Sequence, residues 1–362
     1  MSLNWTRYRR ESIMIAFRHN PFASRALLGV LFLLACSDVT SPEEARNKGT
    51  TPSGPETEPP LSPAPPIPVG SNPIAGATFW VSPNSRAQDQ ANEWRESRPA
   101  DAAQIDKIAR NPHSGWFGDW SANVESAVDS YVSTAAASGA VPVLVAYNIP
   151  QRDCGGLSGG GGSNAAEYRG WISAFARGLR GRSAVVILEP DAVANWSCLS
   201  SGDQATRISL MQHAVAALKA QGKTVVYIDG GNPRWLSANE QATRLKAVNI
   251  AGADGFALNV SNFYASDENI SYGSKVSALV GGKHFIIDTS RNGLGPSPDR
   301  QWCNPDGRAL GTPATTETGN SLVDAYLWVK TPGQSDGACN GAPAAGEWWP
   351  EYALGLAQRS AL

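Results

Sequence analysis

Residues 184–191 read Ala-Val-Val-Ile-Leu-Glu-Pro-Asp, and this stretch decides the fold of the chain. Its first five residues are apolar, as a strand in a parallel sheet requires when both of its faces are buried. Pro190 lacks an N–H and favours an extended residue before it, so Asp191 is expected at the edge where α/β folds carry their functional groups. Asp191 is therefore a candidate catalytic residue. The alternative is that it only caps the turn or helix that follows.

Similar apolar runs, rich in Val and Ile, alternate with segments of helical period from residue 79 onward. This is the pattern of repeated βα units around a parallel sheet. The predicted strands are residues 79–81, 141–148, 184–191, 224–230, 255–262, 284–290 and 325–330. Seven strands indicate a barrel that is one strand short, or open, rather than a regular eightfold one.

Helical segments with their own start and stop signals lie between these strands. Val124, Val128 and Val132 share one helix face before Gly139. A second helix is predicted by the apolar positions Ile208, Met211, Val215 and Leu218, which precede Gly222. Ser237 and Glu240 have the spacing of a capping box and predict the start of a third.

Polar and acidic residues follow most of the predicted strands. They include Asp153, Asp191, Asp229, Asn262, Asp288 and Asp336. The carboxyl ends of parallel strands meet on one face, so these groups should converge there, and capping alone does not explain so many of them. The convergence favours a catalytic site at this face.

Composition limits the class of ligand. The chain has 362 residues, 42% hydrophobic and 17% charged, with a net charge of −2, which gives no reason to expect nucleic acid and suits a neutral substrate. Twelve tryptophans indicate either flat platforms on which sugars stack or a Trp-rich core.

Several other chemistries are not supported by the sequence. The Gly-rich run at residues 154–163 lacks the Gly-Lys-Ser/Thr ending of a phosphate-binding loop, so we interpret it as a mobile loop over a cleft. The four histidines form no helical pair and no two cysteines are close, so neither a metal nor a cofactor is expected. The sequence contains no Gly-x-Ser-x-Gly elbow, so a serine nucleophile is not supported.

The first 73 residues have the composition of a leader and a spacer. Residues 1–36 combine arginines with a short apolar run ending Leu33-Leu34-Ala35-Cys36, similar to the lipobox of bacterial lipoproteins, in which the cysteine is lipidated. The alternative is an ordinary signal peptide and a secreted protein. Residues 37–73 are rich in Pro, Ser and Thr and are expected to be a disordered linker. We therefore expect an exported monomer, held at the cell envelope by its lipid alone, with residues 74–362 as the catalytic domain.

A set of ordered motifs in residues 79–362 resembles glycoside hydrolase family 6, the β-1,4-glucanases that act on cellulose. The motifs are Tyr147-Asn148-Ile149-Pro150, Arg152-Asp153-Cys154, Glu189-Pro190-Asp191, Asp229-Gly230, residues 259–262 and 288–293, Trp302-Cys303-Asn304-Pro305, Leu327-Trp328-Val329-Lys330 and Asp336-Gly337. The resemblance implies a distorted seven-stranded α/β barrel that binds the glucan across its C-terminal rim and cleaves it with inversion.

The resemblance also implies roles for individual residues. Asp191 matches the general acid, Asp153 the carboxylate that tunes it, Asp336 the residue debated as the base, and Tyr147 a residue that crowds the sugar at the cleavage point. The implied substrate-binding residues are Trp116, Asp229, Trp235, Asn262, Trp302, Lys330 and Gln334. Gln334 and Asn232 depart from the family pattern, in which many members have Glu and His at these two positions. Both departures are expected to alter the contacts with the sugar, and so the strength of binding at these subsites relative to those members.

Four cysteines besides Cys36 allow three pairings. The resemblance selects Cys154 with Cys198 and Cys303 with Cys339. The segment between Cys303 and Cys339 is compact, as in endo-acting members, and predicts an open groove and endo action.

The chemistry of an inverting glycosidase agrees with these roles. It needs a protonated carboxyl and a second carboxylate about 6.5 to 9.5 Å away, with a water between them. Asp153, as a nearby like charge, would raise the pKa of Asp191. Two alternatives remain: an exo-acting cellobiohydrolase and a non-catalytic glucan-binding lipoprotein. A lipoprotein scaffold whose carboxylates are only structural does not explain why so many of them converge at one face.

Overall fold

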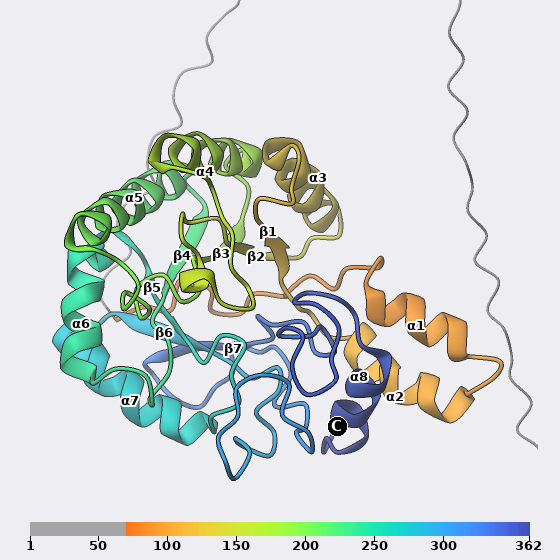
Figure 1. Cartoon of the computed structure of the whole chain (residues 1–362). Coiled ribbons are helices and arrows are strands. Elements are labelled where there is room, and N and C mark those ends of the chain that lie inside the picture. Colours follow the sequence, from red (N-terminus) through yellow and green to blue (C-terminus); the bar gives the residue numbers. More distant parts are fainter. Residues whose placement is uncertain (1–69) are drawn as a thin grey trace, which may run out of the picture. The chain divides into compact units, whose positions relative to one another are not determined.

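The computed structural model describes residues 70–362 and shows seven parallel strands with helices around them (Figure 1). The strands are β1 Gly115–Phe117, β2 Val143–Ala146, β3 Ala184–Leu188, β4 Thr224–Asp229, β5 Gly255–Leu258, β6 His284–Asp288 and β7 Val323–Leu327. Each strand pairs with the next one along the chain. The predicted incomplete barrel of seven parallel strands is confirmed.

The two edge strands, β1 and β7, approach each other without being paired within the sheet. The backbone N–H of Ser114 donates to the Trp328 carbonyl at 3.1 Å, and the Trp116 indole donates to the Val329 carbonyl at 2.9 Å. These bonds join the edges where a regular barrel would have its eighth strand.

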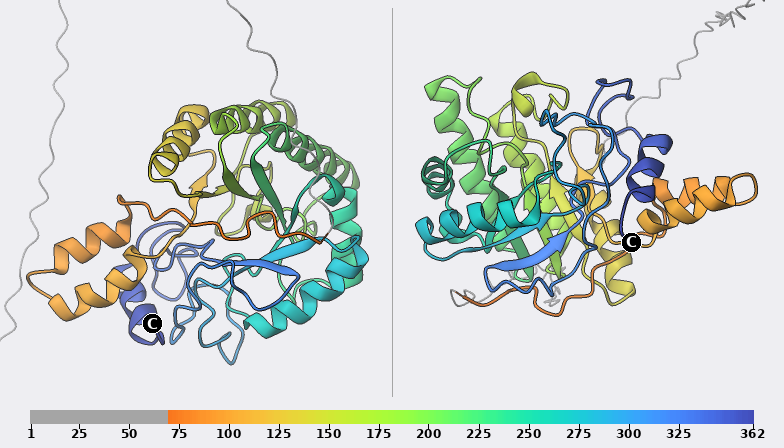
Figure 2. Two further views of the ribbon diagram at one scale, coloured as in Figure 1. Left: turned by 180° about the vertical axis from the view of Figure 1, so that it is seen from behind. Right: turned by 90° about the horizontal axis from the view of Figure 1, so that it is seen from below.

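Helices α3 to α7 form an arc outside the strands, whereas α1, α2 and α8 pack together at one side (Figures 1 and 2). The helices are α1 Arg86–Trp94, α2 Pro99–Ala109, α3 Val124–Ala137, α4 Ala165–Leu179, α5 Ser201–Lys219, α6 Ala238–Ala247, α7 Ser266–Leu279 and α8 Pro350–Gln358, with short 3-10 helices η1 Asp153–Gly155 and η2 Ile250–Gly252. Between residues 70 and 362, none of the helices has the length and apolar character needed to cross a bilayer.

The predicted helix signals act as expected, with two exceptions. Val124, Val128 and Val132 are buried on one face of α3. On α5, Met211, Val215 and Leu218 are buried and Ile208 is half-buried. The Ser237 hydroxyl accepts the N–H of Glu240 at 3.2 Å, but the Glu240 carboxylate pairs with Arg244, so the structure shows only one bond of the predicted capping box.

Strand β3 is buried on both faces, as its sequence predicts. Val185 and Ile187 point into the barrel and pack with Tyr227, while Val186 and Leu188 pack beneath the surrounding helices. Burial of a Val or Leu side chain is worth about 1.5–3 kcal/mol. This core fixes the end of β3, and with it the position of Asp191.

The predicted first strand is wrong. Residues 79–81 form only an isolated parallel bridge, between Phe79 and Val141. The first strand is β1, whose three residues include only two large apolar side chains and are too short to give a period-two pattern. The predicted number of seven strands is correct because this omission balances the false strand.

Most of the predictions for the N-terminal segment concern residues that the structure does not describe. The predicted signal at residues 1–36, with Cys36, and residues 37–69 of the predicted linker lie there. At the end of that linker, the Asn72 side chain donates to the Asp324 carbonyl at 2.8 Å.

Candidate active site

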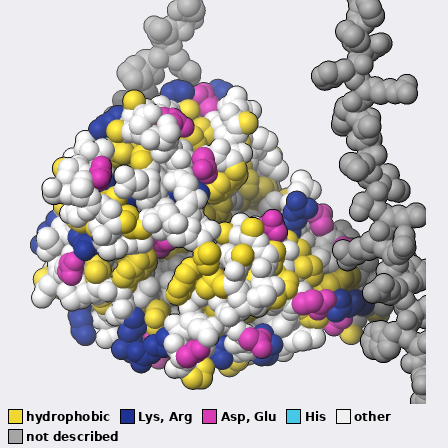
Figure 3. Space-filling model, in the orientation of Figure 1, with side chains coloured by type: hydrophobic (Ala, Val, Ile, Leu, Met, Phe, Trp, Pro, Cys, Tyr) yellow, Lys and Arg dark blue, Asp and Glu magenta, His cyan; other side chains and the backbone are white. Residues whose placement is uncertain are grey.

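A cleft of about 450 Å³ lies at the carboxyl ends of the strands, on the face seen in Figure 3. On that face, charged side chains of both signs are interspersed (Figure 3). Among the residues that line the cleft are nine of the predicted catalytic and binding residues: Trp116, Tyr147, Asp153, Asp191, Trp235, Asn262, Trp302, Lys330 and Asp336. The structure therefore gathers most of the predicted site into one cavity.

Asp191 lies just beyond the end of β3, where the chain turns sharply. Glu189 and Asp191 have φ angles of 50° and 70°, so Glu189 is left-handed and not extended as predicted. The backbone N–H of Asp191 donates to Asp229 at 3.0 Å. This turn of non-glycine residues is strained, and the contacts beneath it hold it in place.

Burial and, second, the neighbouring charge of Asp153 raise the pKa of Asp191, a hydrogen bond with Tyr147 and the charge of Lys330 lower it, and the net result is a pKa of about 7. Asp153 is thus a secondary cause, where the sequence suggested it as the main one. A carboxyl group with a pKa near 7 is about half protonated at neutral pH and can donate a proton.

Buried carboxylates at strand ends brace the loops of the site. Glu189 accepts the N–H groups of Asn148 and Ile149 at 2.9 and 3.0 Å, and burial raises its pKa to about 7. At the end of β6, Asp288 accepts the N–H groups of Ser261 and Lys330 at 3.0 and 2.9 Å. Each bond joins a strand end to the loop of a neighbouring strand.

Asp229 belongs to this bracing group. It is buried beneath Asp191 and is not among the cleft-lining residues, and it accepts the N–H of Gly231 at 3.2 Å as well as that of Asp191. Burial, together with the charge of Asp191, holds the pKa of Asp229 well above its usual range. The structure therefore does not bring this predicted sugar contact to the cleft.

Asp153 lies at the start of the Gly-rich loop, and its carboxylate accepts the N–H of Ser158 at 3.0 Å. Arg152, which is buried, donates to the carbonyls of Tyr147 and Ser158 at 2.8 Å each and to the Asp119 carboxylate at 3.2 Å. These bonds fix the base of the loop that the sequence suggested was mobile.

Leu157 of the same loop contacts Gly337, the residue after Asp336. A Cβ placed on Gly337, which has a φ of 149°, would lie 2.6 Å from the Cβ of Leu157, so the two residues are in contact. Leu157 therefore packs beside the segment that carries Asp336.

Arg207 of α5 connects the two segments that carry Asp153 and Asp191. Its buried guanidinium donates to the carbonyls of Pro150 and Gln151 at 2.8 and 3.0 Å and to that of Asn195 at 3.1 Å. The disulfide between Cys154 and Cys198, with Cα atoms 5.5 Å apart, joins the same segments.

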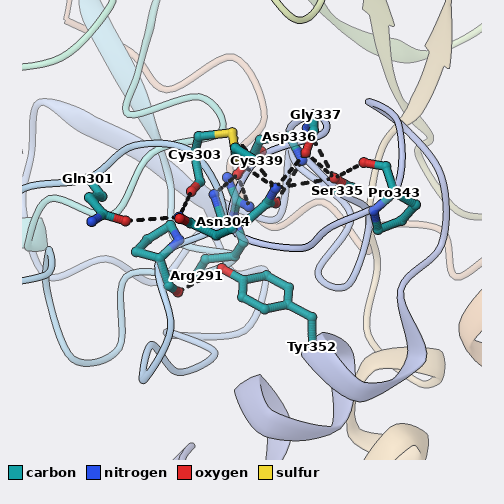
Figure 4. The surroundings of a disulfide bond; sticks show 12 residues. Arg291, Gln301, Cys303, Asn304, Ser335, Asp336, Gly337, Cys339, Pro343 and Tyr352 are labelled. Carbon is teal, nitrogen blue, oxygen red and sulfur yellow. Dashed lines mark hydrogen bonds and ion pairs between the residues drawn. A yellow bond between two sulfur atoms is a disulfide. The ribbon is translucent and has the colours of Figure 1, made fainter.

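Asp336 is buried beside two cations, Arg291 (Figure 4) and Lys330. One of its carboxylate oxygens accepts hydrogen bonds from the Arg291 guanidinium at 2.8 Å and from the backbone N–H of Asn304 at 3.0 Å. The other oxygen lies 3.4 Å from the Lys330 ammonium. Burial raises the pKa of Asp336, but the charges of Arg291 and Lys330 outweigh burial and hold the pKa below its usual value.

The second predicted disulfide closes the loop around Asp336 (Figure 4). Cys303 and Cys339 are bonded, with Cα atoms 6.4 Å apart. Next to this disulfide, the Asn304 side chain donates a hydrogen bond to the Gly337 carbonyl at 2.9 Å. Both predicted pairings are confirmed.

The tryptophans are divided between the core and the cleft. Trp94 and Trp328 belong to the core. Trp235 and Trp302 line the cleft with 37% and 53% of their surfaces exposed, and Trp116 packs edge-on against Tyr147 at a ring distance of 5.3 Å. Flat aromatic faces are thus available along the cleft.

The two residues that depart from the family pattern are placed differently. Asn232 lines the cleft, and its side chain accepts the N–H of Arg234 at 3.0 Å. Gln334 is half-buried, forms a backbone bridge to Trp348 and does not line the cleft.

Other cleft residues were not predicted from the sequence. They are Ser158, Pro190, Asn195, Arg234, Val260, Ser261, Tyr264 and Arg300. Most of them lie within a few residues of a strand end. Their short distance from a predicted strand end is therefore the sequence signal that could have identified them. In residues 70–362, no three His, Cys, Asp or Glu side chains gather in a way that could hold a metal ion.

A parallel α/β barrel with carboxylates and exposed tryptophans in a cleft at its C-terminal rim is the arrangement of a carbohydrate-processing enzyme. Comparison with known proteins identifies the class more closely. Residues 74–360 match the model of glycosyl hydrolases family 6, so the chain belongs to that family.

Two bacterial relatives named endoglucanase A are each 43% identical to the chain. The match to the Cellulomonas fimi protein covers 78% of this chain and 61% of the relative, and that to the Thermobispora bispora protein covers 78% and 62%. The chain thus spans about three-fifths of the length of these curated relatives. Among solved structures, the endoglucanase Cel6 from Mycobacterium tuberculosis, in complex with methyl-cellobiosyl-4-deoxy-4-thio-β-D-cellobioside, is 46% identical with a TM-score of 0.77, covering 80% of this chain and 99% of that one.

Proposed function

We propose that the chain is an endo-β-1,4-glucanase, which hydrolyses internal bonds of cellulose or related β-glucans with inversion. The observation that carries the proposal is that Asp191, with a pKa of about 7, shares one cleft with Asp153, Tyr147 and exposed tryptophans. The names of the relatives support the same activity.

In this proposal Asp191 protonates the oxygen of the leaving sugar. Its pKa keeps the proton available at neutral pH, and its fixed backbone aims the carboxyl into the cleft. Water attacks from the opposite face of the ring, and a β bond therefore gives an α product.

Asp153 and Asp336 have different roles in the proposal. Asp336 already interacts with two cations and a backbone N–H, and its lowered pKa makes it a weak base. Asp153 is half-buried and lines the cleft. We infer that Asp153 helps to deliver the water, while Asp336 holds Arg291 and Lys330 in place.

The glucan would lie along the cleft with its sugar rings on Trp116, Trp235 and Trp302. Asn262 and Lys330 also line the cleft and can bind hydroxyl groups. The cleft contains both polar groups and aromatic faces, which suits a neutral sugar chain. The proposal therefore needs no cofactor.

The decisive experiment compares soluble carboxymethylcellulose with crystalline cellulose. An endo-acting enzyme lowers the viscosity of the soluble polymer early, and NMR of the first sugars released should show the α anomer. Release of the β anomer contradicts inversion. If neither polymer nor mixed-linkage glucan is cleaved, the result favours a non-catalytic glucan-binding module.

An exo-acting cellobiohydrolase is the second candidate. The contact of Leu157 with Gly337 favours it, because it joins the Gly-rich loop to the segment that carries Asp336, and a contact between these two segments would restrict entry of an internal stretch of glucan. Release of cellobiose with almost no early fall in viscosity would support this candidate.

We also propose that the protein is exported and anchored through Cys36. The two disulfides of the folded domain fit an oxidising compartment outside the cytosol. The lipobox-like sequence before Cys36 supports lipidation at that residue.

A further inference from the structure

The charged residues that line the cleft are divided between two parts of its rim. The lining carboxylates follow β2, β3 and β7, and the last of them, Asp336, is already paired with buried cations. In the described part of the chain, the lining residues that follow β4, β5 and β6 include Arg234 and Arg300 and no carboxylate. These three strands are neighbours in the sheet, so one continuous part of the rim is basic.

The two arginines differ in whether their charge is balanced. Arg234 forms an ion pair with Glu268 of α7. Arg300 is exposed, and within residues 70–362 its guanidinium has no hydrogen-bond or ion-pair partner. The acid next to it in the sequence, Asp299, accepts a hydrogen bond from the Gln301 side chain at 2.5 Å instead. Arg300 therefore brings an unpaired positive charge to the cleft.

The backbone holds Arg300 in an uncommon conformation. Its φ angle is 57°, in the left-handed region that is unfavourable for a residue with a Cβ atom. Its N–H donates to the Ser297 carbonyl at 2.8 Å, and the Ser297 hydroxyl accepts the N–H of Gln301 at 2.9 Å. The Asn340 side chain donates to that of Gln301 at 2.9 Å and ties the turn to another loop. Such strained residues often occur where a protein binds its ligand, so this turn provides a fixed base for a binding group.

A guanidinium beside an aromatic ring suits a sugar that carries a carboxylate. The guanidinium stays charged and donates in a fork that matches the two oxygens of a carboxylate. Trp302, two residues further along the chain, lines the same cleft and is 53% exposed. A neutral glucan offers the charge of Arg300 no counter-ion, whereas a carboxylate on a neighbouring sugar unit does.

We propose that Arg300 is a specificity-determining residue that binds a carboxylate on a β-1,4-glucan, so that oxidised glucans are substrates as well as neutral ones. Carboxylates from two sources have this chemistry. One is a glucuronate unit, formed by oxidation of the C6 hydroxyl, and the other is an aldonate end, formed by oxidation at C1. The proposal rests on the proposed function and extends its substrate class.

The test is the ratio of kcat/KM for an anionic hexasaccharide to kcat/KM for cellohexaose. Two anionic probes are used: cellohexaose oxidised at C6 of one unit, and cellohexaonic acid. Arg300→Gln should lower the ratio for at least one probe by about 2- to 5-fold at low ionic strength, the range expected for loss of one exposed ion pair. The probe whose ratio falls identifies the source of the carboxylate.

Two further variants separate the local charge of Arg300 from the net charge of the protein. Arg300→Lys keeps the positive charge and should retain most of the ratio. Arg86→Gln is the matched control, because it removes one positive charge from an exposed residue of α1 that does not line the cleft. The control should keep the wild-type ratio. A fall in Arg86→Gln as large as that in Arg300→Gln overturns the proposal.

Salt provides a second measurement. Exposed charges are screened over about 10 Å at 0.1 M salt and about 3 Å at 1 M. The anionic-to-neutral ratio of wild type should therefore fall as NaCl is raised, and that of Arg300→Gln should change less. An equal salt dependence of the two ratios overturns the proposal.

The remaining outcomes also decide the proposal. An unchanged ratio in Arg300→Gln for both probes overturns it, and so does an equal loss on all three sugars, which would mean that Arg300 binds a hydroxyl group. Wild type that cleaves cellohexaose and neither anionic probe overturns it as well.

The failure of the proposed function would be distinguishable, because wild type would then cleave none of the three sugars. Calorimetry with the same sugars tests Arg300 in that case. A larger loss of affinity in Arg300→Gln for an anionic sugar than for cellohexaose supports the proposal, and equal changes for all three overturn it.

Discussion

Replacing Asp191 with Ala tests the proposed mechanism at its first step. General acid catalysis is typically worth about 10²- to 10⁴-fold, so Asp191→Ala should lose that factor in kcat on unactivated glucan, with little change in binding. On an aryl cellobioside with a good leaving group, the loss should be much smaller, because that leaving group needs less protonation. Equal losses on both substrates would refute the role of Asp191 as the acid.

The pKa of Asp191 sets the direction of the pH dependence. The protonated carboxyl is the active form, so activity on unactivated glucan should fall as the pH rises through about 7. With that pKa, about nine in ten molecules are protonated at pH 6 and about one in ten at pH 8, which predicts a roughly tenfold fall in kcat/KM between these values.

Asp153→Asn provides the companion measurement. The charge of Asp153 is the second cause that raises the pKa of Asp191, so its removal should move the alkaline limb of the profile to lower pH. An alkaline limb that stays in place, or moves to higher pH, would show that the limb belongs to another group. The profile is measured as kcat/KM on soluble glucan, since that ratio reports the free enzyme.

Three further predictions follow from the site and the sequence. Asp336→Asn leaves Arg291 and Lys330 buried with a neutral partner, so it should lower activity and reduce the free energy of unfolding by about 3–5 kcal/mol. Added azide should not restore the activity of this variant. Rescue by azide would instead identify Asp336 as the direct base. Replacing Cys154 and Cys198 together with Ala should lower the free energy of unfolding, measured with denaturant, by up to about 4 kcal/mol for a separation of 44 residues, and an unchanged midpoint would contradict this. Labelled fatty acid should be incorporated into wild type and not into Cys36→Ala, and labelling that persists in the variant rules out that anchor.

The sequence predicted the parallel barrel well because buried strands have a strong local signal. Five apolar residues followed by Glu-Pro-Asp are sufficient to identify β3 and the site of Asp191. Strand β1 has no such signal, since its three residues are held by pairing with β2 and by bonds from Ser114 and Trp116 to the segment after β7. Contacts between residues more than 200 positions apart are not visible in a local pattern.

The functional residues were predicted less evenly than the strands, for a physical reason. Polar groups at strand ends can either face the ligand or bind the backbone of the next loop, and both uses place the same residue types at the same positions. Asp191 faces the cleft, whereas one carboxylate oxygen of Asp229 and both oxygens of Glu189 accept hydrogen bonds from backbone N–H groups. Only the spatial arrangement of neighbouring loops separates the two uses.

The bracing carboxylates also explain why Asp191 can keep a raised pKa. The turn from Glu189 to Asp191 has left-handed residues that would relax if unsupported, and Asp229 holds the Asp191 N–H at 3.0 Å. Glu189 holds the loop after β2 that leads to Asp153, so the distance between the two cleft carboxylates depends on both braces. The bracing residues therefore shape the electrostatics of a cleft whose surface they do not line.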